Sequence, residues 1–249
     1  MTGPVSGPMP SSGWVVPAAS PATRVRAAYD RRAETDYYFD GVALVVVLTI
    51  ITFGIYGFYV FYQLMRRARD HNKRRLELLE AATDLAWEQT VARGLDGELR
   101  PAFERISLHF QPLRVLTTEF REPAIWLVFL IGASLVGGFV LGVVPWMIGL
   151  VFIDGDFVRH DVHEGAVEAE LSAIYGRLDA SVPAPDPSRV KGKQNYAGRI
   201  VATVLTCGIY GFWWMVDAMR DGNYHFQWNW PWEDALLPAV QSLDTTPSP

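Results

Sequence analysis

The polar and apolar residues of this chain are segregated into blocks, and three uncharged apolar runs dominate the pattern. The runs cover residues 42–64, 124–153 and 200–216. A helix needs about 20 apolar residues to cross a bilayer, and soluble folds rarely contain uncharged runs of this length. The pattern therefore predicts an all-α, polytopic membrane protein with transmembrane helices and a helical cytoplasmic insertion.

Between the first two runs, apolar residues recur at helical spacing in two stretches. The first stretch includes Leu78 and Leu85 and ends at Gly94, and the second, over 101–120, includes Ile106 and Leu113. Such stripes predict two amphipathic helices that pair as a hairpin outside the membrane. The simplest interpretation of each stripe is that it packs against the other helix.

These patterns divide the chain into seven segments. Aromatic residues of the last segment are typical of a membrane interface. The predicted segments are a disordered Pro-rich N-terminal segment (1–40), a first transmembrane repeat (41–65), an amphipathic helical hairpin (66–123), a Gly-rich membrane segment that is either a hairpin or one long span (124–153), a short helix with a basic Pro-rich linker (154–198), a second transmembrane repeat (199–221) and an aromatic interfacial tail (222–249).

The positions of Lys and Arg bear on how the chain crosses the membrane. Four precede the first run, 11 lie between the first and second runs, six lie between the second and third, and one follows. If the middle run crosses once, the two sides carry 10 and 12 basic residues; if it returns, they carry 17 and 5. The positive-inside rule favours the second arrangement, with both termini outside. A single tilted span for the middle run stays open.

One eight-residue segment occurs twice, as TFGIYGFY from position 52 and as TCGIYGFW from position 206. Ten of 20 positions are identical between 47–66 and 201–220, which indicates an internal duplication. Because the basic flank follows the first copy and precedes the second, the copies are expected to insert in opposite directions. The glycines are expected to allow close helix packing or a local break; the alternative is a midplane binding site that uses the hydroxyls. The motif residues are Thr52, Gly54, Ile55, Tyr56, Gly57, Thr206, Gly208, Ile209, Tyr210 and Gly211.

The segments LTIITFGIYGFYVFYQLMRRARDHN and ATVLTCGIYGFWWMVDAMRDGN resemble a bacterial membrane family called domain of unknown function 4234. The hallmark of that family is a T-x-G-I-Y-G-x-[YW]-W-like segment that is often duplicated. Val60 stands where the family usually has the tryptophan that Trp214 supplies in the second copy. The resemblance implies a multi-pass protein of the bacterial inner membrane and brings no assigned activity.

Composition and motifs exclude several classes of function. The net charge of −5 argues against nucleic-acid binding, which needs a basic face. The only cysteine, Cys207, leaves no internal disulfide. No phosphate loop, nucleophile elbow or zinc-protease helix occurs in the sequence, so we predict a non-enzymatic protein with no catalytic residue, cofactor or metal. His160 and His163, one helical turn apart, are only weak metal candidates because no second ligand group is evident. The remaining histidines, His71, His109 and His225, are expected to be isolated polar surface residues.

Six basic residues lie within ten positions directly after the first run. They are expected either to engage anionic lipid headgroups, at about 1 kcal/mol each, or only to anchor the topology. The sequence thus predicts a scaffold or interaction protein whose cytoplasmic helices engage a protein partner, a second copy of the chain or anionic lipid. The alternative is a transporter or channel for a small solute or ion, built on inverted repeats. The candidate lipid-binding residues are Arg66, Arg67, Arg69, Lys73, Arg74 and Arg75.

Overall fold

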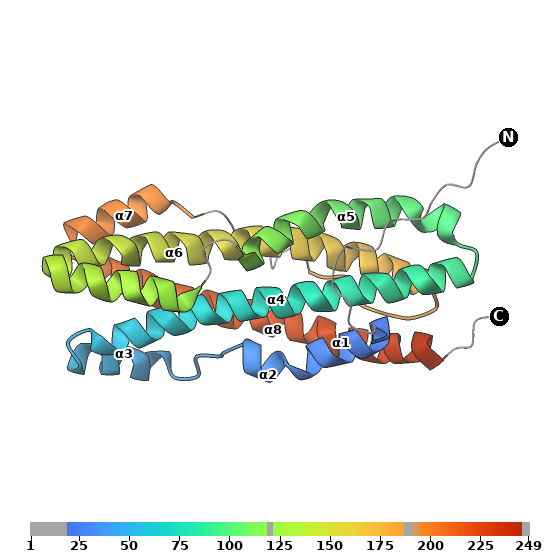
Figure 1. The fold of residues 1–249 in the computed structure, drawn as a ribbon, viewed down its shortest axis with the longest axis horizontal. Coiled ribbons are helices and arrows are strands. Elements are labelled where there is room, and N and C mark those ends of the chain that lie inside the picture. The colour runs from blue at the N-terminus through green and yellow to red at the C-terminus, as the bar shows by residue number, and fades with distance from the viewer. Residues whose placement is uncertain (1–18, 119–121, 187–191, 193, 246–249) are drawn as a thin grey trace.

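Three long helices give the protein an elongated shape (Figure 1). The computed structural model describes residues 19–118, 122–186, 192 and 194–245, and all elements in these ranges are α-helices, which confirms the predicted all-α class. Helices α4, α6 and α8 contain 38, 55 and 37 residues. The helices are α1 (Pro21–Asp30), α2 (Arg32–Thr35), α3 (Val42–Ile51), α4 (Ile55–Ala92), α5 (Asp96–Thr118), α6 (Pro123–Arg177), α7 (Tyr196–Leu205) and α8 (Ile209–Thr245).

The first copy of the repeated motif is a turn between two helices, so the predicted transmembrane repeat at 41–65 is interrupted by the kind of local break that its glycines were expected to allow. Between α3 and α4, Phe53 and Gly54 have φ angles of 51° and 89°, a left-handed conformation that glycine adopts at least cost. The amide of Gly54 donates to the carbonyl of Thr49 at 2.8 Å, which closes the end of α3 as in a Schellman motif. The chain therefore folds back on itself as a helical hairpin (Figure 1).

The second copy has the same geometry between α7 and α8. Cys207 and Gly208 have φ angles of 49° and 92°, and the amide of Gly208 donates to the carbonyl of Thr203 at 2.8 Å. In each copy the motif threonine hydroxyl donates to the carbonyl four residues earlier at 2.7 Å and accepts the amide of the motif tyrosine at 3.0 Å. These hydroxyls therefore satisfy backbone hydrogen-bonding groups of the turn.

The second glycine of each motif lets the two arms of its hairpin touch. A Cβ at Gly57 would lie 3.4 Å from the methyl group of Thr49, and one at Gly211 would lie 2.8 Å from the methyl group of Thr203. In each motif, the first glycine therefore provides the break between the helices and the second provides their close packing.

The middle apolar run also folds as a hairpin rather than as one long span. Gly137 and Gly138 have non-helical backbone angles inside α6. The rings of Trp126 and Phe152 lie 5.5 Å apart, although 26 positions of straight helix would separate them by about 39 Å. Within the hairpin, a Cβ at Gly142 would lie 2.3 Å from the hydroxyl oxygen of Ser134, so this glycine allows the two arms to pack closely.

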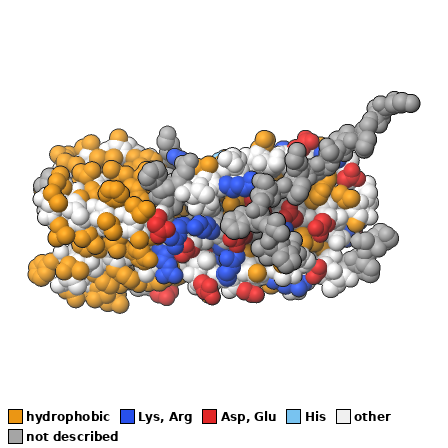
Figure 2. Space-filling model, in the orientation of Figure 1, with side chains coloured by type: hydrophobic (Ala, Val, Ile, Leu, Met, Phe, Trp, Pro, Cys, Tyr) orange, Lys and Arg blue, Asp and Glu red, His pale blue; other side chains and the backbone are white. Residues whose placement is uncertain are grey.

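All three hairpin turns lie at the same end of the molecule (Figure 1). We call this end the apolar tip; it comprises α3, residues 55–62 of α4, residues 124–153 of α6, α7, and residues 209–216 of α8. Helices α3 and α7 both run toward the end where the hairpin turns lie, so the two copies of the repeat are parallel. The prediction that the copies insert in opposite directions is therefore wrong. The tip surface is apolar (Figure 2): Phe53, Leu135 and Val136 are 98%, 82% and 85% exposed.

The remaining described residues form the helical body. Three of the segments predicted from the sequence have a different structure in this body. Helices α1 and α2 replace the predicted disorder over 21–35, while residues 1–18 lie outside the described residues. Helix α6 continues to Arg177, so residues 154–177 are part of a long helix rather than a separate short one. Helix α8 continues through the predicted tail, where Phe226 and Trp232 are buried and Tyr224 and Trp228 are exposed. The tail is therefore an amphipathic helix of the body.

Among the described residues, one helix, Leu141–Arg177, is long and apolar enough to cross a membrane. A second would require counting Asp96–Thr118 and Pro123–Gly138 as a single broken span. Helices α3 and α7 are apolar but have only ten residues each. A buried core helix of a soluble protein meets the same criterion, so this finding is weak support for membrane association.

We expect Gly54→Ala to lower the free energy of unfolding by about 1–2 kcal/mol, because left-handed backbone is costly for a residue with a Cβ. A Cβ at this position would meet no atom within 4 Å, so the cost is conformational rather than steric. Thermal unfolding in detergent measures the effect. Gly132→Ala is the matched control, because Gly132 is equally open but lies within a helix, where alanine is favoured. A Gly54→Ala protein as stable as this control would contradict the assignment.

Candidate functional site

A buried polar cluster lies in the helical body between two hydrophobic cores. One core, at the apolar tip, includes Phe61 and Trp214, and the other includes Leu79 and Leu171. Such a cluster is costly unless its members satisfy one another. Its members are His71, Arg74 and Arg75 from α4; His160, Asp161, Glu164 and Glu168 from α6; His225, Asn229 and Glu233 from α8; and Asp36, which follows α2.

The arginine half of this cluster ties the three long helices together. Arg75 is fully buried; its Nη1 donates to Glu233 at 2.8 Å, and its other nitrogens donate to Glu164 and Glu168. Arg74 donates twice to Glu233, each time at 2.9 Å. Hydrogen bonds to ionised groups of this kind are the strong ones in proteins.

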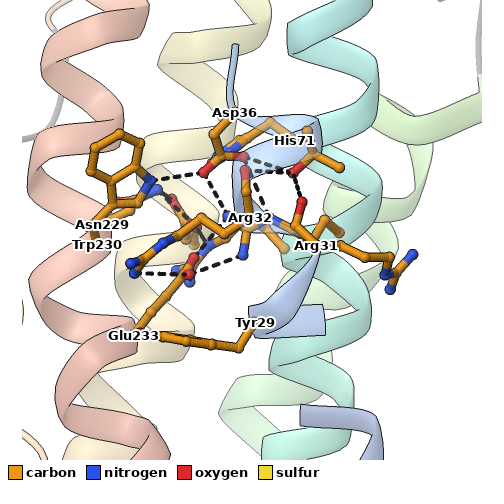
Figure 3. A network of polar contacts seen from close by, with 12 residues as sticks. Tyr29, Arg31, Arg32, Asp36, His71, Asn229, Trp230 and Glu233 are labelled. Carbon is orange, nitrogen blue, oxygen red and sulfur yellow. Dashed lines mark hydrogen bonds and ion pairs between the residues drawn. The ribbon is translucent and has the colours of Figure 1, made fainter. Parts of the chain in front are cut away.

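Asp36 connects the N-terminal segment to the same cluster (Figure 3). Its carboxylate accepts hydrogen bonds from Arg74 at 2.8 Å and from the indole of Trp230 at 2.9 Å, and it lies 2.8 Å from Nδ1 of His71. Burial raises the pKa of Asp36, but His71, Arg74 and Trp230 outweigh burial and hold the pKa well below its usual range. Asp36 is therefore ionised, and its carboxylate accepts hydrogen bonds from His71, Arg74 and Trp230.

The histidine half brings three imidazole rings together from three helices. The ring centroids of His71, His160 and His225 lie 4.8–5.4 Å apart. Nδ1 of His71 faces Asp36, and Nδ1 of His225 lies 2.7 Å from Asp161 Oδ1. Burial lowers the pKa of His71 to about 3, despite the opposing effect of Asp36. The His71 ring is therefore neutral at pH 7, with its proton on the nitrogen that faces the carboxylate.

His160 completes this group beside Glu164. It is 1% exposed, and within the described part of the chain neither of its ring nitrogens has a hydrogen-bond partner. Its Nε2 lies 3.3 Å from Glu164 Oε2. One ligand-type atom from each of His71, His160, Glu164 and His225 can be chosen so that all lie within 4.8 Å of one another. Imidazole nitrogen and carboxylate oxygen are donors that bind divalent transition metals.

The predicted lipid-binding cluster is divided between the core and the surface. Arg67, Arg74 and Arg75 are buried, so they cannot meet lipid headgroups. Arg67 instead donates to the carbonyls of Ala218 and Met219 at 2.6 and 3.0 Å. The other three basic residues, Arg66, Arg69 and Lys73, remain at least partly exposed.

The histidines are arranged differently from the prediction. His71 and His225, predicted as isolated surface residues, are buried beside His160. His163 is not part of this group; its Nδ1 lies 3.0 Å from Nδ1 of His109. His71 and His225 are 154 positions apart, which is also the offset between Thr52 and Thr206. Extending the repeat alignment by five residues would have paired these two histidines.

Residues 40–148 match the model of the family described as Domain of unknown function (DUF4234), which confirms the family resemblance over the first of the two motif segments. The match covers less than half of the 249-residue chain. It includes His71, whereas His160, Glu164 and His225 lie beyond it. Comparisons with curated proteins and with solved structures gave no match.

Proposed function

We propose that this chain is an integral membrane protein that inserts three helical hairpins into a bilayer from one side, starting from a family match that assigns no activity. The observation that carries the proposal is the segregation of exposed apolar side chains at the end where all three turns lie (Figure 2). Monomeric soluble proteins rarely expose apolar patches of such extent, whereas a membrane-facing surface requires them.

The lengths of the hairpin arms support insertion without crossing. Helices α3 and α7 have ten residues each, or about 15 Å, and the 15 residues from Pro123 to Gly137 span about 22 Å. A bilayer has a hydrocarbon core of about 30 Å, so each arm turns back inside it. Backbone at that depth must be satisfied within the protein. The threonine hydroxyls and the amides of Gly54 and Gly208 satisfy the carbonyls at two of the turns.

A non-enzymatic anchoring or interaction role fits this arrangement best. The apolar stripes of α4 and α5, including Leu78 and Ile106, are packed in the core, so they do not form a partner surface. Exposed Arg66 lies four residues beyond the tip portion of α4, or about 6 Å along the helix, where it would meet anionic headgroups. The alternative of a transporter with a midplane site keeps little support, because the Thr52 and Thr206 hydroxyls are used within the turns.

Depth-dependent fluorescence quenching tests the proposal on the full chain in liposomes. An environment-sensitive fluorophore on Cys207, which is exposed in the α7–α8 turn, is expected to be quenched most by nitroxides deep in the acyl chains. A Cys207→Ser chain with Phe53→Cys should behave in the same way, and one with Ser107→Cys, on the exposed surface of α5, should not be quenched. A membrane-impermeant maleimide should fail to reach either tip position from either side. Labelling of a tip cysteine from the far side would show crossing spans instead.

A further inference from the structure

We propose that His71, His160, His225 and Glu164 bind one divalent transition-metal ion of the zinc class. The inference concerns the helical body and does not depend on how the apolar tip meets the membrane. It is carried by four features of the cluster, namely the spacing of the ligand atoms, the facing Nε2 atoms of His71 and His225, the burial of His160 beside Glu164, and the surrounding carboxylates.

The spacing of the ligand atoms matches a tetrahedral site. Zinc binds imidazole nitrogen and carboxylate oxygen at about 2.0–2.2 Å, which places tetrahedral ligand atoms about 3.4 Å apart. Nε2 of His71 and Nε2 of His225 lie 2.9 Å apart, and Nε2 of His160 lies 3.3 Å from Glu164 Oε2. Nε2 of His225 lies 3.7 Å from that same oxygen. The three separations bracket the tetrahedral value, so small side-chain shifts would close the four atoms on one ion.

The Nε2 atoms of His71 and His225 face each other at a separation of 2.9 Å. A carboxylate only accepts hydrogen bonds, so the ring nitrogens that face Asp36 and Asp161 are the ones that donate. Each ring therefore presents its Nε2 to the centre of the cluster, where a single cation can bind both atoms. The arrangement of Nδ1 on a carboxylate and Nε2 toward the centre is also the usual one for metal-bound histidine.

His160 has a place in such a site, because its Nε2 lies 3.3 Å from Oε2 of Glu164, another proposed ligand. It is a buried side chain, and in the described ranges both of its ring nitrogens lack a hydrogen-bond partner. Asn229 closes the cluster from the α8 side, since its amide nitrogen lies 2.9 Å from Nε2 of His225 and 3.1 Å from Glu164 Oε2. When a metal binds, this amide can keep its hydrogen bond to Glu164 and release the imidazole.

The charge around the site favours a cation. Five buried carboxylates of the cluster surround the guanidinium groups of Arg74 and Arg75. Arg32, at the edge of the cluster, lies 3.9 Å from Glu233 but pairs more closely with Asp234, at 2.6 Å. Carboxylates therefore outnumber guanidinium groups in a region shielded from water, and such a region favours a bound cation.

The donor set also indicates the class and role of the ion. Three imidazoles and one carboxylate suit borderline ions such as Zn²⁺, whereas Mg²⁺ and Ca²⁺ prefer all-oxygen ligands. Four protein ligands, each buried, describe a closed structural site rather than a catalytic one with an open position. Because the ligands come from α4, α6 and α8, the ion would clamp the three long helices at the base of the apolar tip.

Metal titration of the full-length protein in detergent, after removal of bound metal with EDTA, tests the proposal. We expect one equivalent of Zn²⁺ to bind by calorimetry, Co²⁺ to give the intense visible bands of four-coordinate cobalt, and Zn²⁺ to raise the Tm. In His160→Gln the Zn²⁺ affinity should fall at least about 100-fold, since even outer-shell changes cost 10–100-fold. The polar contact of His160 is the 3.3 Å approach of its Nε2 to Glu164 Oε2, which the amide of glutamine can replace as a donor, so the metal-free variant should keep the Tm of the metal-free wild type.

His163→Gln is the matched control, because His163 lies one turn from His160 on the same helix but outside the cluster; it should bind Zn²⁺ like the wild type. Absence of Zn²⁺ and Co²⁺ binding by the folded wild type, or equal affinity in His160→Gln, would overturn the proposal. Should His160→Gln not fold, X-ray absorption of the zinc-loaded wild type decides. Scattering from several imidazole ligands would support the site. A sulfur ligand or an all-oxygen shell would overturn it, and sulfur could come only from Cys207 or a methionine.

Discussion

Arg75→Met is expected to lower the free energy of unfolding by about 3–5 kcal/mol, the usual cost of removing one partner from a buried ion pair. Arg75 has no solvent exposure, and its guanidinium bonds to Glu164, Glu168 and Glu233. Methionine keeps the length and packing of the aliphatic stem, so the loss reports the charge rather than a cavity. Glu164 and Glu168 would then lose their bonds to this guanidinium group, while Glu233 would keep those to Arg74.

Lys73→Met is the control for this prediction. Lys73 lies two residues earlier on α4 but is exposed, and surface substitutions of this kind usually change stability by less than about 0.5 kcal/mol. Both variants can be compared by chemical unfolding in detergent, followed by circular dichroism. If Arg75→Met is no less stable than Lys73→Met, the buried network does not hold the helices together.

The sequence predicted the helices well and their internal contacts poorly, and α4 shows why. Its apolar stripe was evident from Leu78 and Leu85, and both are buried as expected. Arg67, Arg74 and Arg75 were assigned to lipid headgroups because charge after an apolar run usually marks a membrane interface. Yet Arg67, Arg74 and Leu78 follow one another at spacings of seven and four, which places them on one helical face. That periodicity was readable, and it indicated that the charges point inward.

The polar cluster could not be assembled from local patterns, because each long helix contributes only a few of its members. The i, i+4 pair of His160 and Glu164 lies on α6, while His71 and His225 come from positions 154 apart. A metal motif read along the chain needs closely spaced ligands. In this chain the internal repeat relates the two histidines, because His71 and His225 occupy equivalent positions of its two copies and meet in the bundle.

The prediction of opposite insertion failed because it assumed that both copies of the repeat cross the membrane. A glycine within an apolar run is equally compatible with close packing and with a turn, and only the backbone angles of Gly54 and Gly208 distinguish the two. Counting basic residues on two sides has meaning only for segments that cross. Under the proposed one-sided insertion, the helical body with its charges lies on a single side, and the uneven count of 17 and 5 says nothing about direction.

Phe53→Asp, together with Cys207→Asp at the equivalent position, is expected to weaken membrane insertion by about 2.5–3.5 kcal/mol per site, the cost of an aspartate near the bilayer centre. Both residues occupy left-handed turns, with φ of 51° and 49°, and aspartate tolerates this conformation better than most residues. The fold should therefore be retained while the tip loses its affinity for acyl chains.

Flotation with liposomes and retention after an alkaline carbonate wash measure this effect, with Leu108→Asp as the control. Leu108 is an equally apolar residue that is 72% exposed, but it lies on α5 in the helical body. If the tip enters the bilayer, the Phe53→Asp/Cys207→Asp double variant leaves the membrane fraction while the Leu108→Asp variant stays. If both variants stay, or both leave, exposure of apolar side chains at the tip does not determine insertion, because the tip and the body would then respond alike.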